Sequence, residues 1–118
     1  MNIILRHAIF SVCFALAACS GGVDESKAIA GAKATFEADL KDPSSVQYRN
    51  VEFFHEKYAE YSDGKFDTDT ICFEVNAKNS YGAYVGFSNR SCTRKYDASG
   101  KTPGKFTCHA FNFCKDKK

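Results

Sequence analysis

The pattern of apolar and polar positions first predicts a helix over residues 24–43. Ile29, Ala32, Phe36 and Leu40 recur at helical spacing and form one apolar stripe. Acidic residues at its start favour helix initiation, and the Asp-Pro step at its end stops the helix. We expect the stripe to pack on a core. A glycine in the middle, at position 31, either weakens the helix or lets it approach a neighbour.

The period of the pattern then changes to two, which is typical of β-strands. Val46 and Tyr48 alternate with polar residues, whereas Val51 and Phe53 alternate in the opposite phase. One extra residue reverses which way a strand faces, so we predict a β-bulge near Arg49-Asn50. An Asp-Gly turn follows this strand.

Residues 71–87 predict a β-hairpin, because apolar and polar residues alternate on both sides of a short connection. We expect its apolar residues to pack against the helix: Ile71, Phe73, Val75, Ala83, Val85 and Phe87. Residues 97–105 are rich in turn formers. Residues 106–114 are interpreted as either a strand or a short helix, and the pattern does not decide between them.

The polar face of the predicted hairpin is the candidate binding surface. Tyrosine is enriched at interfaces, and a glycine in a strand marks a bulge or lets another backbone come close. The candidate residues are Asn76, Asn79, Tyr81, Tyr84 and Gly86. The alternative is purely architectural: Gly82 serves the turn, Gly86 gives room to a core aromatic and Tyr84 covers the sheet.

The first 18 residues form a separate segment. A short positive opening precedes an apolar run over residues 8–18, which is too short to span a bilayer and has the size of a signal-peptide core. The next motif, Leu16-Ala17-Ala18-Cys19, resembles the lipobox of bacterial lipoproteins. That resemblance implies cleavage before Cys19 and acylation of this residue, with Ser20 after it favouring the outer membrane. We therefore expect residues 1–18 to be a signal peptide, 19–26 a lipidated cysteine and flexible tether, and 27–118 one domain.

Four cysteines remain beyond the signal and lipobox cysteines, and an oxidising compartment implies two disulfides with three possible pairings. Cys92 and Cys108 lie symmetrically about Gly100, so a hairpin would place them opposite each other. We predict the pairs Cys92–Cys108 and Cys72–Cys114. The predicted fold is α+β: an N-terminal helix on a small antiparallel sheet of three to five strands, stabilised by disulfides.

Charge is distributed unevenly along the chain. Residues 19–77 hold 6 Lys and Arg against 12 Asp and Glu, and residues 78–118 hold 9 against 2, for net charges of −6 and +7. Such asymmetry marks an anionic partner or a membrane surface, or else the two halves fold together and neutralise each other. We favour mutual neutralisation, because about 95 residues hardly form two domains.

The sequence contains no pattern that requires catalysis or a metal. Residues 99–105 lack the spacing of a phosphate loop, and Asp63, Asp67 and Asp69 lack the closing Glu of a calcium loop. The cysteine spacing does not match a zinc site, and His55 and His109 have no clear nucleophile nearby. We expect no cofactor, no metal and no enzymatic activity.

Two further motifs carry a second resemblance. The segments LKDPSSVQYRNV and CFEVNAKNSYGAYVGF are similar to a small bacterial and phage-borne family with the patterns L-K-D-P-x-S-x-x-[FY]-R-N-V and C-G-E-V-N-A-K-N-x-x-G-G-Y-x-G-F. This chain departs from the pattern at Phe73 and Ala83, where glycine is usual. The resemblance bears on architecture and implies no activity.

The function we expect is that of a non-catalytic binding module anchored through Cys19 to the envelope, facing the periplasm. Its partner would be an envelope protein, peptidoglycan or lipopolysaccharide, and not nucleic acid. The alternative is an immunity, inhibitor or phage superinfection-exclusion lipoprotein.

Overall fold

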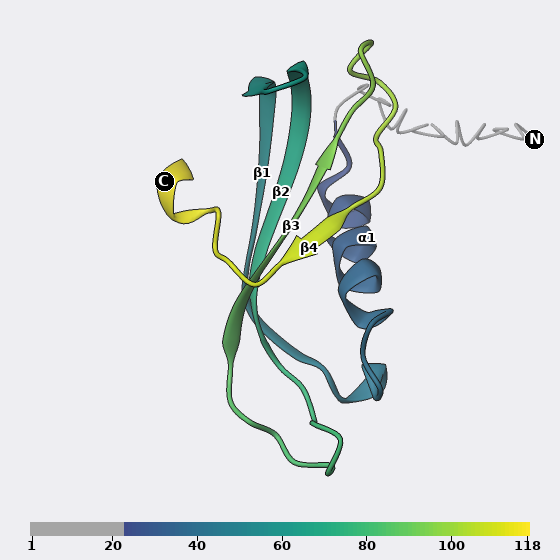
Figure 1. The fold of residues 1–118 in the computed structure, drawn as a ribbon, viewed down its shortest axis with the longest axis vertical. Coiled ribbons are helices and arrows are strands. Elements are labelled where there is room, and N and C mark those ends of the chain that lie inside the picture. Colours follow the sequence, from purple (N-terminus) through teal and green to yellow (C-terminus); the bar gives the residue numbers. More distant parts are fainter. Residues whose placement is uncertain (1–22) are drawn as a thin grey trace, which may run out of the picture.

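A computed structural model describes residues 23–118, and it shows one helix packed on a four-stranded antiparallel sheet (Figure 1). The strand order in the sheet is β1-β2-β3-β4, so each strand pairs with its neighbour in the chain. The predicted α+β fold is therefore confirmed. The elements are α1 (Glu25–Glu37), η1 (Pro43–Ser45), β1 (Gln47–Tyr61), β2 (Gly64–Asn76), β3 (Ser88–Lys95), β4 (Thr107–His109) and η2 (Lys115–Lys117).

Helix α1 begins at Glu25, directly after its N-cap residue Asp24. The Asp24 carboxylate accepts a hydrogen bond from the Lys27 backbone N–H at 3.1 Å and caps the first turn. The helix therefore begins inside residues 19–26, the segment predicted as a tether. Ala28 and Ala32 are fully buried in the core. A Cβ added at Gly31 would lie 3.2 Å from the ring of Phe106, so this glycine permits a close approach between the helix and the chain leading into β4.

The helix ends earlier than its apolar stripe suggested. It stops at Glu37, and the chain then turns through η1, which begins at Pro43. Leu40, predicted as the last residue of the stripe, lies beyond the helix and is only half-buried. The predicted stop at Asp42-Pro43 therefore marks the start of η1 and not the end of α1.

The pairing of β1 with β2 contains the predicted bulge. The register shifts between Arg49 and Glu52, and Asn50 adopts a φ of +53° there, a conformation that asparagine tolerates better than most residues. A second shift lies between Glu56 and Ala59, with Tyr58 at a φ of +56°, and no sequence signal predicted it. The first bulge turns Phe53 to the core, while Val51 stays exposed.

The core lies between α1 and one face of the sheet. Ile71, Phe73 and Val75 of β2 point to the helix, as their alternation predicted, and Cys92 of β3 lies beside them. The ring of Phe73 meets two further aromatic rings edge to face, with centroid distances of 5.8 Å to Phe36 and 5.3 Å to Tyr48. These contacts join side chains of the helix, β1 and β2 in one core.

The predicted hairpin over residues 71–87 is only half correct. Its first strand is the end of β2, but the returning strand β3 begins at Ser88, after a loop over residues 77–87. Ala83 and Val85 are exposed in that loop and Phe87 is half-buried, so none of the three belongs to the buried core. The prediction that these three residues pack against the helix is wrong. Their alternation imitates a strand, whereas the loop is held by side chains described below.

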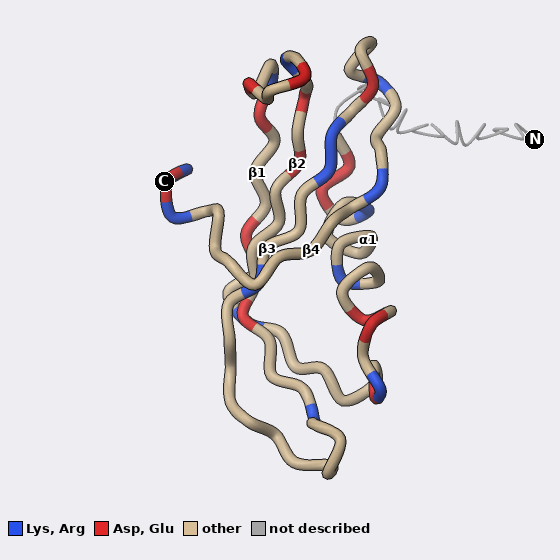
Figure 2. Tube along the Cα trace, viewed as in Figure 1, with Lys and Arg blue, Asp and Glu red and all other residues tan. Residues whose placement is uncertain are grey.

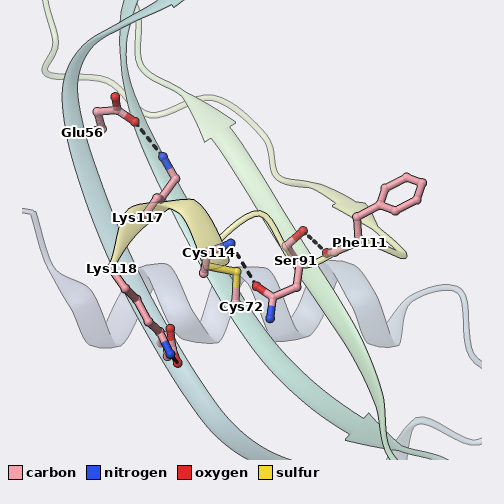
Figure 3. Close-up of a disulfide and its surroundings, with 9 residues drawn as sticks. Glu56, Cys72, Ser91, Phe111, Cys114, Lys117 and Lys118 are labelled. Atoms are coloured by element: carbon pink, nitrogen blue, oxygen red, sulfur yellow. Dashed lines mark hydrogen bonds and ion pairs between the residues drawn. A yellow bond between two sulfur atoms is a disulfide. The ribbon is translucent and has the colours of Figure 1, made fainter.

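Both predicted disulfides are present. Cys92 and Cys108 are direct register partners in β3 and β4, and their sulfur atoms are bonded. Cys72 and Cys114 form the second bond, with a Cα–Cα distance of 6.2 Å. Figure 3 shows how this second bond fixes the C-terminal segment, residues 110–118, to the face of the sheet opposite the helix. We call that side the outer face.

Ion pairs join the acidic and basic halves of the chain. Within the described residues, Asp63, Glu56, Glu52 and Asp69 of the first half each contact a Lys or Arg of the second half. The structure thus supports mutual neutralisation as the use of these charges. No described helix has the length and apolar character needed to cross a membrane.

Candidate binding loop

The five predicted binding residues all lie at one end of the molecule, in or beside the loop over residues 77–87 (the 77–87 loop). In Figure 1 this loop forms the lower end of the molecule, and α1 begins near the upper end. The question for each residue is whether it builds the loop or is free to contact a partner.

Asn79 builds the turn of the loop. Its side-chain Oδ1 accepts hydrogen bonds from the backbone N–H groups of Tyr81 (2.9 Å) and Ala83 (3.2 Å). Its backbone N–H donates to the Ala83 carbonyl at 2.9 Å, and its carbonyl accepts from Gly82 at 3.0 Å. Asparagine side chains often replace backbone partners in this way. Gly82 has a φ of +78°, so the turn needs a residue without a Cβ there.

Asn76 and Gly86 fix the exit of the loop. The Asn76 Oδ1 accepts a hydrogen bond from the Gly86 backbone N–H at 3.1 Å. Gly86 has a φ of +99°, and a Cβ added to it would meet no atom within 4 Å. This glycine therefore serves backbone conformation, and it does not make room for a core aromatic residue as the architectural alternative supposed.

Tyr84 ties the loop to the segment before β1. Its hydroxyl donates to the Ser45 carbonyl at 2.8 Å, and the Ser45 hydroxyl accepts a hydrogen bond from the Lys78 backbone N–H at 3.1 Å. The Lys78 ammonium lies 5.7 Å from the centre of the Tyr84 ring. With its hydroxyl occupied and its ring half-exposed, Tyr84 acts mainly as a brace for the loop.

Tyr81 is the residue left free for contact. Its side chain is 95% exposed, and Val85 beside it is 74% exposed. Figure 2 shows the loop almost without charged positions, Lys78 being its only coloured residue. Asn76 and Asn79 accept hydrogen bonds from three backbone N–H groups of the loop, and the Tyr84 hydroxyl ties it to Ser45, so Tyr81 and Val85 are presented on a preformed support. The sequence proposed these residues as one face of a hairpin; the structure brings them together in a loop and separates the residues that hold it from the exposed Tyr81 and Val85.

A second polar cluster was missed by the sequence interpretation. Asp69 on β2 is fully buried and accepts hydrogen bonds from His55 Nδ1 (2.7 Å), Arg94 Nε (2.8 Å) and the Tyr96 hydroxyl (2.7 Å). Burial, followed by the hydrogen bond to Asp69, raises the pKa of Tyr96. A signal existed: Asp69 has the same strand parity as Ile71 and Phe73, so alternation places it on the core face.

This Asp69 cluster, made of His55, Asp69, Arg94 and Tyr96, has the character of a structural network. Each partner of the buried carboxylate is a hydrogen-bond donor, so its charge is satisfied within the protein. Among the described residues, no Ser, Thr or Cys is hydrogen-bonded to His55, and no group of three or more His, Cys, Asp or Glu is arranged to hold a metal.

Cys19 and the lipobox lie outside the described residues. In comparisons with family models, curated proteins and solved structures, we found no match to this chain. The lipobox and the two family motifs therefore stay predictions.

Proposed function

We propose that the protein is a non-catalytic binding module of a bacterial envelope, anchored through a lipid on Cys19, which contacts a partner protein with the 77–87 loop. The observation that carries this proposal is Tyr81, which is 95% exposed at the tip of a loop whose backbone is fixed by side-chain hydrogen bonds. Exposed aromatic residues on rigid supports are typical anchors of protein interfaces, because little conformational entropy is lost on binding.

The position of the loop supports the same proposal. The described chain begins at Val23, close to the start of α1, and the loop lies at the other end of the molecule (Figure 1). A lipid on Cys19, four residues before Val23, would hold the first end near a membrane. The loop would then point away from that membrane, towards soluble or envelope-bound proteins. Lys78 in the loop and Lys41 beside it would favour a partner surface that is neutral or acidic.

Site-specific photo-crosslinking in living cells tests the contact. We expect a photoreactive amino acid in place of Tyr81 to give one dominant crosslinked protein. The same residue in place of Tyr58, an aromatic that is 72% exposed on β1, is the matched control and should not give that product. If the two positions give the same set of products, or position 81 gives none, the 77–87 loop is not the contact surface. A crosslinked envelope protein would support the binding module. A crosslinked foreign protein would support the inhibitor alternative.

The anchor is tested separately. We expect Cys19→Ala to abolish labelling with a fatty acid and to leave the precursor uncleaved by the lipoprotein signal peptidase. Persistent label in that variant would contradict the lipobox interpretation. It would leave the crosslinking result at position 81 untouched.

A further inference from the structure

The outer face of the sheet carries a polar hollow that is distinct from the 77–87 loop. Its volume is about 510 Å³, within the range of about 300–1,000 Å³ found for small-molecule sites. Its polar lining consists of Asn50, Glu52, Glu74, Asn89, Asn112 and Lys118. These side chains come from three strands and from the C-terminal segment, so the complete fold is needed to assemble them.

Two features of the sequence create the hollow. The bulge in β1 places Asn50 and Glu52 along one wall. The Cys72–Cys114 disulfide holds the C-terminal segment, which ends at Lys118, over the outer face (Figure 3). Asn112 and Lys118 of this segment complete the lining of the hollow. The Asn112 Oδ1 accepts a hydrogen bond from the Cys114 backbone N–H at 2.9 Å, which fixes this amide and leaves its N–H₂ group available.

The two carboxylates are held in place by cations. Glu74 accepts hydrogen bonds from Arg49 Nε (3.2 Å) and Nη2 (3.3 Å), and also from the Asn50 amide. The hydrogen bonds from Arg49, and then from Asn50, lower the pKa of Glu74, so this side chain is charged at neutral pH. Glu52 pairs with the Lys118 ammonium at 2.8 Å. The formal charges of these two pairs cancel.

Asn89 supplies free hydrogen-bonding capacity beside these fixed groups. It is exposed, it lies directly opposite Glu74 in the β2–β3 register, and its side chain forms no hydrogen bond with another described residue. Its amide therefore offers two donors and an acceptor to a ligand. The carboxylate of Glu74 next to it offers further acceptor sites.

This chemistry selects a class of ligand. A balanced set of charges gives no net attraction to an ion, and walls that are mostly polar do not suit an acyl chain. Hydroxyl groups, which donate to carboxylates and accept from amides, match the lining. We propose that the hollow on the outer face binds a saccharide unit of a neutral glycan. The proposal is independent of the lipid anchor and of the 77–87 loop.

Titration of the purified full-length protein with two neutral oligosaccharides, followed by amide chemical shifts, tests this site. The protein is kept in a detergent without a sugar headgroup. Chitotetraose represents amino-sugar glycans such as peptidoglycan strands, and maltotetraose represents hexose glycans. We expect saturable shifts around Asn89 and Glu74 with one of them, at millimolar concentration or below. Raising the salt concentration should leave the affinity unchanged, because the ligand is uncharged.

Variants then locate the site. Asn89→Ala should weaken binding by about tenfold, which corresponds to the loss of one or two hydrogen bonds, while the melting temperature stays the same. Gln47→Ala, which removes an exposed amide of the same sheet outside the hollow, should not change the affinity. Three results would overturn the proposal: no saturation by either sugar, equal affinity in the Asn89→Ala protein, or affinity that falls steeply with salt.

Discussion

The two ends of the molecule use similar side chains in opposite ways. Near the start of the helix, the buried carboxylate of Asp69 gathers donors from three other side chains, so the polar groups satisfy one another. At the 77–87 loop, the Asn79 and Asn76 side chains satisfy backbone groups, and an apolar surface at Tyr81 is left in solvent. The first arrangement contributes to stability, whereas the second contributes little to stability and holds a surface ready for contact. Substitutions at the two ends should therefore separate folding from binding.

The largest effect is expected for Asp69→Ala. Removing this carboxylate leaves Arg94, whose side chain is only 14% exposed, without its buried partner and also frees the Tyr96 hydroxyl. Breaking a buried pair in this way costs about 3–5 kcal/mol in the free energy of unfolding. Urea denaturation followed by circular dichroism measures it. Asp63→Ala is the control, because its exposed pair with Lys95 should contribute little. A similar loss in both variants would remove the distinction between structural and surface charges.

The next largest effects are expected when the disulfides are removed. The bond between Cys72 and Cys114 closes a separation of 42 residues, and the bond between Cys92 and Cys108 closes one of 16. Chain-entropy arguments give losses of about 4 and about 3 kcal/mol for the paired Cys→Ser variants. Denaturation of each variant measures the loss of stability. Crosslinking from position 81 is then carried out under conditions below the unfolding transition of each variant. The crosslink should persist in folded protein, since neither bond touches the 77–87 loop. Its loss would mean that the two ends are coupled.

The parts of the fold that could be predicted from the sequence are those that depend on local patterns. Local patterns were sufficient for the presence of the helix but not for its end, for the bulge at Asn50 and for the pairing of Cys92 with Cys108, because each depends on spacing along a short stretch. The position of β3 was not predictable in this way. Residues 83–87 alternate as a strand does, and one of the interactions that hold them in a loop, from Tyr84 to Ser45, joins positions 39 residues apart.

The Asp69 cluster illustrates the second limit of sequence reasoning. Strand alternation would have placed Asp69 on the core face, although no prediction was made from it, and only the assembled sheet brings His55 from β1 and Arg94 from β3 to the same carboxylate. Likewise, the candidate binding residues were proposed from the tyrosines and glycines of a predicted hairpin. Tyr84 is less exposed than Tyr81, and its hydroxyl is hydrogen-bonded to Ser45, a residue distant in the sequence.

A smaller effect is expected for Gly86→Ala. The φ of +99° disfavours any residue with a Cβ, while the space around it is open, so the cost comes from backbone strain alone and should be about 1 kcal/mol. Gly86→Asn should lose less, since asparagine tolerates positive φ better. Thermal unfolding of the two variants provides the comparison. If both lose several kcal/mol, the surrounding structure is packed more tightly than the open space indicates.

The smallest effect on stability, and the largest on binding, is expected for Tyr81→Ala. The side chain is 95% exposed, so its removal should leave the melting temperature unchanged. As an interface anchor, the same side chain should contribute about 1–2 kcal/mol or more to the affinity for the protein captured from position 81. Calorimetric titration with that protein measures the affinity, and Tyr84→Phe is the matched variant. Loss of the Tyr84 hydroxyl bond to Ser45 should lower stability by about 1 kcal/mol and leave the affinity of folded protein near normal. The opposite result, weak binding in Tyr84→Phe and normal binding in Tyr81→Ala, would show that the brace is the contact residue.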